Sequence, residues 1–199
     1  MDNGYNTRMQ SAASKPKIAA QKAPSRSKSP KGSSPIQVAG MISGVVDKLW
    51  ETNDTYFHDG DYVRCISLCR ICVEVDPNFD EAYSSGGYLL WSLGENASAE
   101  AFLEYGTRRS KKPGPLNSEM GQQLFRTKNY AAALPYFQKA IKLGGVEVTT
   151  YTTLGHCYTR LNRFEDAVEA WKQVVAKFPS FLAGPKNLKD AEARLKAGK

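Results

Sequence analysis

The sequence predicts an all-α fold, a solenoid built from antiparallel helix pairs. A pattern of 34 residues recurs four times without an insertion, and its copies start at Val46, Asp80, Gly114 and Val148. Within the copies, apolar residues favour positions 4, 7, 8 and 11, and then 20, 24 and 27, which is the spacing of two helical stripes. One such hairpin cannot bury its apolar face alone, so neighbouring hairpins must stack on it.

Turn residues divide each copy into two helices. Positions 15 and 16 hold residues at which a helix ends and a tight turn begins. These residues are Gly60, Gly94, the Lys128-Asn129 pair and the Asn162-Arg163 pair. Small residues at positions 8 and 20 let the two helices approach closely, and Pro or Gly near position 32 ends the second helix. The four units are therefore 46–79, 80–113, 114–147 and 148–181.

The fourth unit carries the most complete pattern. Its positions 4, 7, 8, 11, 20, 24, 27 and 32 read Tyr151, Leu154, Gly155, Tyr158, Ala167, Trp171, Val174 and Pro179. This resembles the tetratricopeptide repeat, with its aromatic, Leu-Gly, Tyr, Ala, aromatic and Pro signature. The third unit follows the pattern well. The second has Gly86 and Gly106 in place of Leu and Ala, and the first has Thr52-Asn53 in place of Leu-Gly. The resemblance implies a right-handed superhelix of helix pairs.

The segments at the two ends of the array have different compositions. Residues 182–199 are predicted to form a capping helix, because Leu188, Ala191 and Leu195 keep helical spacing among charged residues. Residues 1–45 are predicted to be a disordered basic tail and a lead-in. The tail has seven Lys or Arg against one acid and little apolar surface to offset the entropy of ordering. The lead-in, 36–46, is apolar but interrupted by glycine, and we expect it to pack on the first repeat.

Charge and hydropathy limit the choice of partner and compartment. Most of the formal net charge of +7 belongs to the tail, so only residues 1–35 are expected to meet nucleic acid or an acidic surface. No apolar run reaches the ~20 residues of a transmembrane helix. A contiguous apolar core of a signal peptide is also missing, and four unpaired cysteines suit a reducing compartment. We therefore expect a cytoplasmic protein. Its oligomeric state stays open, a homo-oligomer included.

Three cysteines form a C-x3-C-x2-C motif, the spacing with which radical S-adenosylmethionine enzymes hold an iron–sulfur cluster. Here Cys65, Cys69 and Cys72 stand at positions 20, 24 and 27 of the first unit, where the fold needs apolar groups that face inward. Free Cys behaves as a small buried hydrophobe. The interpretation favoured by this placement is structural, so no metal and no cofactor are expected.

Signatures of catalysis are missing from the sequence. It contains no phosphate-binding glycine loop, no H-E-x-x-H and no G-x-S-x-G. The two histidines, His58 and His156, fall in the first and fourth units, too far apart to share a metal ion. We expect a protein that is not an enzyme.

The resemblance implies a binding surface instead. In tetratricopeptide domains the first helix of each unit lines a concave groove, into which positions 2, 5, 9, 12 and 13 point. These positions hold twenty residues of this chain, and the candidate peptide-binding residues chosen from them are Trp50, Asp54, Phe57, Tyr88, Trp91, Gln122, Phe125, Arg126, His156 and Arg160. Packing between helices explains the position-12 aromatics Phe57, Trp91 and Phe125 equally well. The predicted function is a scaffold or adaptor that binds a peptide segment with apolar anchors.

Two alternatives accompany this prediction. Bacterial type III secretion chaperones are also short repeat proteins, and they hold apolar segments of secreted partners. Tethering to nucleic acid or an acidic surface through the basic tail is the other alternative. The carboxylate clamp of heat-shock chaperone adaptors is not expected, because its basic and Asn positions are occupied by different residues. These are Trp50, Asp54, Ser85, Pro115 and Glu119.

Overall fold

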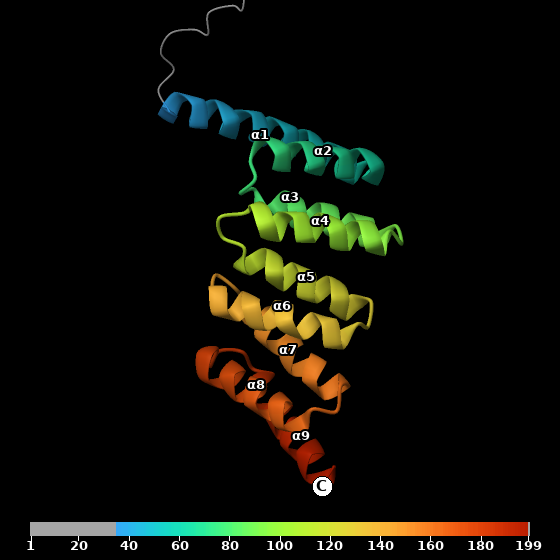
Figure 1. Cartoon of the computed structure of the whole chain (residues 1–199), viewed down its shortest axis with the longest axis vertical. Helices are drawn as coiled ribbons and strands as arrows, with labels where there is room; N and C mark the ends of the chain where they lie inside the picture. Colours follow the sequence, from blue (N-terminus) through green and yellow to red (C-terminus); the bar gives the residue numbers. More distant parts are fainter. Residues whose placement is uncertain (1–34, 199) are drawn as a thin grey trace, which may run out of the picture. The chain divides into compact units, whose positions relative to one another are not determined.

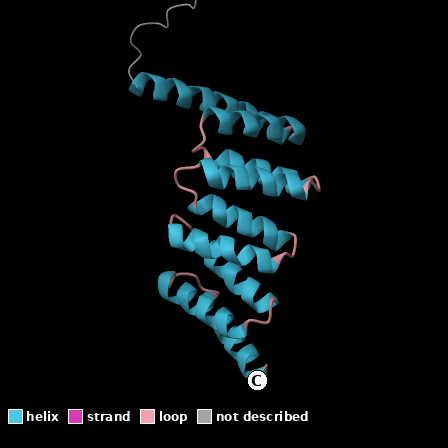
Figure 2. Ribbon diagram, in the orientation of Figure 1, coloured by secondary structure: helices cyan, strands magenta, loops and turns pink. Residues whose placement is uncertain are grey.

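The computed structural model describes residues 35–198, which form nine α-helices and no strand (Figures 1 and 2). The helices are α1 Pro35–His58, α2 Tyr62–Val75, α3 Asp80–Ser92, α4 Asn96–Arg109, α5 Gly114–Arg126, α6 Tyr130–Leu143, α7 Val148–Arg160, α8 Phe164–Lys177 and α9 Gly184–Ala197. Of residues 1–45, predicted to be a disordered basic tail and a lead-in, residues 1–34 lie outside the described residues, as does Lys199.

The helices stack in chain order, and each packs against the next (Figure 1). In addition α3 packs against α5 and α5 against α7, so the first helices of units two to four share one layer. Helices α3, α5 and α7 begin at Asp80, Gly114 and Val148, the first residues of these units. The predicted all-α solenoid is confirmed.

Each hairpin turn contains one residue with a positive φ angle. The four residues are Gly60 at 75°, Gly94 at 84°, Lys128 at 63° and Asn162 at 57°. Glycine adopts this left-handed conformation without a steric cost, whereas a residue with a Cβ atom is strained by roughly 1–2 kcal/mol. The turn forms even with Lys at this position, so the packing of the two helices outweighs the local strain in unit three.

Close approach within the hairpins depends on a pairing between positions 8 and 24. In units two to four, position 8 is glycine and lies under the side chain at position 24. A Cβ atom added to these glycines would stand 2.9 Å from Leu103 for Gly87, 2.7 Å from Phe137 for Gly121 and 2.8 Å from Trp171 for Gly155. Real Cβ contacts are longer than this. The prediction that small residues at position 8 allow close approach agrees with these distances.

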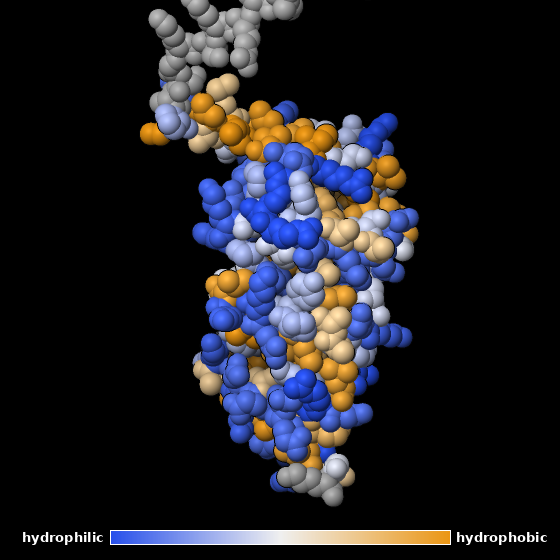
Figure 3. Space-filling view, viewed as in Figure 1, coloured by the Kyte–Doolittle hydropathy of each residue, from blue (hydrophilic) through white to orange (hydrophobic). Residues whose placement is uncertain are grey.

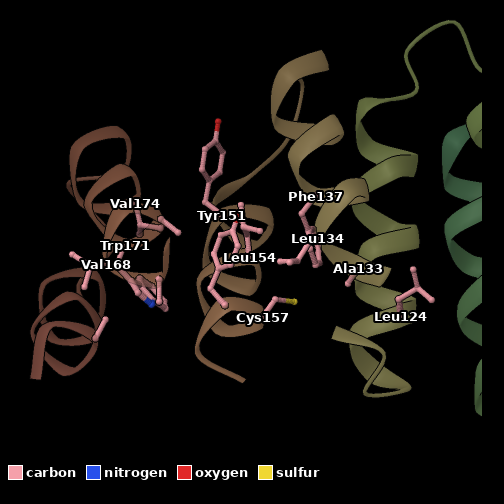
Figure 4. Close-up of a cluster of buried hydrophobic side chains, with 14 of the residues drawn as sticks. Leu124, Ala133, Leu134, Phe137, Tyr151, Leu154, Cys157, Val168, Trp171 and Val174 are labelled. Carbon is pink, nitrogen blue, oxygen red and sulfur yellow. The ribbon is translucent and has the colours of Figure 1, made fainter. Parts of the chain in front are cut away.

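The buried apolar side chains form two clusters. The N-terminal core contains the three cysteines of α2 together with Tyr83, Phe102 and Leu116 among others. The C-terminal core is larger. It extends from Leu103 to Ala191 and includes Phe137, Leu154 and Trp171 (Figure 4).

The last helix covers the C-terminal core. Helix α9 packs on α8, and Ala191 is only 3% exposed. Leu188 and Leu195 pack against the same core. Its outward face carries charged residues, so α9 presents a polar surface to solvent at this end of the stack.

The beginning of α1 corrects a prediction. Residues 35–45 are helical and continue directly into the first repeat, but they do not pack on it. The exposed fraction is 84% for Ile36, 68% for Met41 and 50% for Val45. The reason is length: α1 has 24 residues and its hairpin partner α2 has 14, so no helix faces the first part of α1. Figure 3 shows the apolar surface that gathers there.

The cysteines are packed inside the protein. Cys65, Cys69 and Cys72 are all fully buried in the N-terminal core, and Cys157 is fully buried in the C-terminal core. Burial raises the pKa of each thiol, for Cys69 and Cys157 to about 12. No group of three His, Cys, Asp or Glu residues in the described part of the chain is arranged to hold a metal ion. No helix within residues 35–198 is both long and apolar enough to cross a membrane.

Candidate functional site

A groove of about 520 Å³ opens on the first helices of units one to three. Trp50, Asn53, Asp54 and Phe57 line it from α1, Glu81, Ser84, Ser85, Tyr88 and Leu89 from α3, and Glu119 from α5. We call this hollow the groove. Its lining combines three aromatic side chains with three carboxylates and contains no Lys or Arg.

The aromatic side chains give the groove accessible apolar surface. Phe57 is 48% exposed and Tyr88 49% exposed. Trp50 is partly buried, because its ring stands edge-on against Phe79 with the centroids 4.9 Å apart. Phe79 lies in the connection between α2 and α3, so the inter-unit loop holds the indole in place. These rings suit an apolar ligand group, because covering half-exposed aromatic surface removes it from water and so favours binding.

The carboxylates come from three different helices. Asp54 Oδ1 lies 3.6 Å from Nε2 of His58, one turn further along α1, and both side chains are exposed. Glu81 is exposed as well. Glu119 is more enclosed: burial raises the pKa of its carboxyl, and the positive charge of Arg126 opposes that rise.

Arg126 lies at the edge of the groove. Its guanidinium sits over the rings of Trp91 and Tyr88, with Cζ 5.2 Å and 5.8 Å from their centroids. Burial lowers the pKa of Arg126, while Glu119 and Tyr88 raise it. The guanidinium therefore lies against aromatic faces of unit two, and its Nη2 donates a 3.5 Å hydrogen bond to Oε1 of Gln123 on its own helix.

Three other predicted residues take part in packing between helices. Trp91 packs against the N-terminal core beneath Arg126, and Phe125 packs against the C-terminal core with its ring 5.3 Å from that of Tyr130. Gln122 donates a hydrogen bond from Nε2 to Oγ1 of Thr153, 3.1 Å away on the next unit. Of the position-12 aromatics, only Phe57 lines the groove.

The two predicted residues of unit four lie in a different hollow. His156 and Arg160 line a space of about 370 Å³ with Thr159, Asn162 and Arg194, the last from the capping helix. The ring of His156 stands edge-on to Trp171 at 5.0 Å. Burial lowers the pKa of His156, and the positive charge of Arg160 lowers it further. This hollow is basic, in contrast to the groove.

Some groove residues are missing from the sequence-based set. Ser85 and Glu119 stand at position 6 of their units, and Asn53 and Leu89 at positions 8 and 10. A signal for position 6 existed, because the clamp of heat-shock adaptors uses that position. The family rule of positions 2, 5, 9, 12 and 13 leaves it out.

Several solved structures share this fold. Among those similar to this chain are the MamA protein (20% identity, covering 79% of this chain and 84% of that chain, TM-score 0.62) and PilF of Pseudomonas aeruginosa (14%, 78%, 71% and 0.64). Another is YrrB, described as a TPR protein with an unusual peptide-binding site (17% identity, 78% and 84% covered, TM-score 0.58). At these identities the likeness concerns the fold.

One family model matches part of the sequence. The model of the tetratricopeptide repeat matches residues 148–176, inside the fourth unit. The fourth unit therefore matches the tetratricopeptide repeat in sequence, and the described residues share the fold of solved tetratricopeptide repeat structures. Proteins of the tetratricopeptide repeat family are in general interaction scaffolds without enzyme activity, and their fold implies a protein or peptide partner. The groove on units one to three is the surface to consider first for such a partner.

Proposed function

We propose that this protein is a non-enzymatic adaptor that binds a peptide segment of a partner protein in the groove between α1, α3 and α5. The observation that carries the proposal is the set of aromatic side chains, two of them half-exposed, that line a hollow on the first helices. Trp50, Phe57 and Tyr88 converge there from two successive units. The description of YrrB as a protein with a peptide-binding site supports a peptide ligand for this fold.

The energetic centre of the site is the aromatic pair Phe57 and Tyr88. Buried aromatic anchors dominate peptide binding, and truncating one typically costs ~2 kcal/mol or more, which is about thirtyfold in affinity. Trp50 contributes too, but its ring also packs on Phe79, so its truncation weakens both the fold and the site. Tyr88 is the cleaner test, because its ring is half-exposed and contacts mainly Trp91 and Arg126.

A random peptide display library tests the proposal without knowledge of the natural partner. The selected peptides should bind the wild-type chain and lose about thirtyfold in affinity towards Tyr88→Ala and Phe57→Ala. Lys172→Ala is the control, because Lys172 is exposed on α8 and makes only a 3.6 Å ion pair with Glu169. Thermal unfolding of each variant checks the fold. Equal affinity of the peptides for all four proteins would reject the groove as the binding surface.

A further inference from the structure

We infer that the peptide segment bound in the groove presents a Lys or Arg side chain next to its apolar anchor. This inference rests on the proposed function and adds the chemistry of the ligand. It depends on charge complementarity: the lining has three carboxylates, those of Asp54, Glu81 and Glu119, and neither Lys nor Arg. A neutral apolar segment would cover these carboxylates without a partner, and desolvation of an unpaired carboxylate is costly.

The three carboxylates differ in the partners that the protein itself offers to their negative charge. Glu119 has the nearby guanidinium of Arg126, whose charge acts on its carboxyl. Asp54 has His58 at 3.6 Å, a contact between exposed side chains. The side chain of Glu81 makes no hydrogen bond or ion pair with any residue that the structure describes. The negative charge without a cationic partner thus belongs to Asp54 and Glu81. Both come from units one and two, which also supply Phe57 and Tyr88.

The protein already shows how this surface holds a cation. Arg126 lies over the faces of Trp91 and Tyr88, and the negative charge of Glu119 acts on it without a direct ion pair. Aromatic faces attract a cation through their quadrupole, and a neighbouring carboxylate adds direct attraction. Across the groove, Trp50 and Phe57 are the aromatic groups and Asp54 and Glu81 the carboxylates, with no cation of the lining between them. A ligand Lys or Arg completes the same arrangement there.

An acidic segment is disfavoured for the same reason. It would place like charges next to three carboxylates, and such juxtaposition selects against a wrong partner. Arg126 gives little relief, because its guanidinium is already engaged at the edge of the groove. Arg160, another candidate peptide-binding residue, lines the separate basic hollow with His156.

The same display library tests this inference on the full chain. Clones that depend on the groove are those lost with Tyr88→Ala, and they should be enriched in Lys and Arg relative to the unselected library. For the strongest of these peptides, replacing its basic residue by Gln should weaken binding about tenfold, and replacing it by Glu should weaken binding further. Higher salt should reduce the affinity of the basic peptide more than that of its Gln version.

Charge variants of the protein then locate the contact. Asp54→Asn and Glu81→Gln change exposed side chains, so both proteins should fold normally. Each should weaken the basic peptide several-fold and leave the Gln peptide unchanged. Glu169→Gln on α8 removes one charge far from the groove and serves as the matched control.

The possible outcomes separate this inference from the proposed function. Groove-dependent clones without enrichment of Lys and Arg would overturn the inference and leave the adaptor proposal standing. Equal binding of the basic peptide and its Gln version would do the same. Clones that are all indifferent to Tyr88→Ala would overturn both.

Discussion

The first and fourth units make the same helix contact in different ways. In unit four, Gly155 at position 8 lies under the large side chain of Trp171 at position 24. In unit one, position 8 is the buried Asn53 and position 24 is the small Cys69. Asn53 Nδ2 donates to Sγ of Cys69 at 3.2 Å and to the carbonyl oxygen of Cys65 at 3.3 Å. We infer that the repeat requires the side chains at positions 8 and 24 together to fill the space between the two helices, whichever residues supply the volume.

Asn53 brings a polar amide to a position that is glycine in the other three units, and this buried amide needs hydrogen-bond partners. An amide buried between two helices costs free energy unless it is hydrogen-bonded. Asn53 meets this requirement through a thiol and a backbone carbonyl of α2, both of which lie within reach because Cys69 is small. The C-x3-C-x2-C motif is thus part of the packing of unit one.

Truncation at position 24 should give the largest difference between the two units. Trp171→Ala removes the largest side chain among the most buried residues, and it should cost about 3–5 kcal/mol of stability. Cys69→Ala removes a single sulfur atom and should cost about 1 kcal/mol. Urea unfolding followed by circular dichroism measures both. Similar losses would show that the cavity at position 24 does not set the cost.

Replacing the residues at positions 8 and 24 of unit one by those of another unit tests whether their summed side-chain volume is what matters. Asn53→Gly should cost about 1–2 kcal/mol through the cavity and the flexible glycine, and Cys69→Leu about 1–3 kcal/mol through overpacking against Asn53. The double variant reproduces the glycine and large-residue pair of unit two. It should be more stable than the sum of the single losses predicts, by about 1 kcal/mol or more.

Additive losses in that cycle would contradict the idea of a shared volume. The control combines Asn53→Gly with Val168→Ala, a buried residue of α8 in the C-terminal core. Because these sites share no partner, their losses should add within about 0.5 kcal/mol.

These comparisons show which parts of the fold follow from the sequence. The 34-residue period and the turn residues predict where the units begin. Two helices of this length that pack against each other leave the turn between them little conformational freedom. Even Lys128 takes the left-handed turn conformation there. The exposed beginning of α1 was not predictable in the same way. Gly40 and Gly44 suggest an interrupted segment, yet the helix tolerates them at a cost of ~1 kcal/mol each.

The groove was predictable to a smaller extent. The geometry of the repeat places Trp50 and Tyr88 in it, because positions 5 and 9 face the same side of successive first helices. Trp91 and Phe125 share position 12 with Phe57, but they are covered by Arg126 and Tyr130. Which neighbour covers an aromatic ring depends on side chains from other units, and no position rule within one repeat contains that information.

Alkaline pH should destabilise both cores through their thiols. Burial raises the pKa of Cys69 and of Cys157 to about 12, from an ordinary value of 9.0. The folded protein therefore keeps these protons where the unfolded chain releases them. The contribution is fully present below pH 9.0 and is lost as the pH rises towards 12. Cys69→Ala and Cys157→Ala should each make the fall in stability shallower, measured by urea unfolding between pH 8 and 11. An unchanged slope in both variants would exclude the thiols as its cause.

The smallest effect is expected at the beginning of α1, where side chains are already exposed. Deletion of residues 1–45 keeps Val46, the first buried residue of α1, and removes Ile36, Met41 and Val45. The described residues among those removed, 35–45, are largely exposed already, so the free energy of unfolding should change by no more than about 0.5 kcal/mol. Deletion of residues 184–199 is the matched comparison at the other end. It uncovers the C-terminal core that α9 protects and should cost several-fold more. Equal losses at the two ends would mean that the first part of α1 is covered in the intact protein.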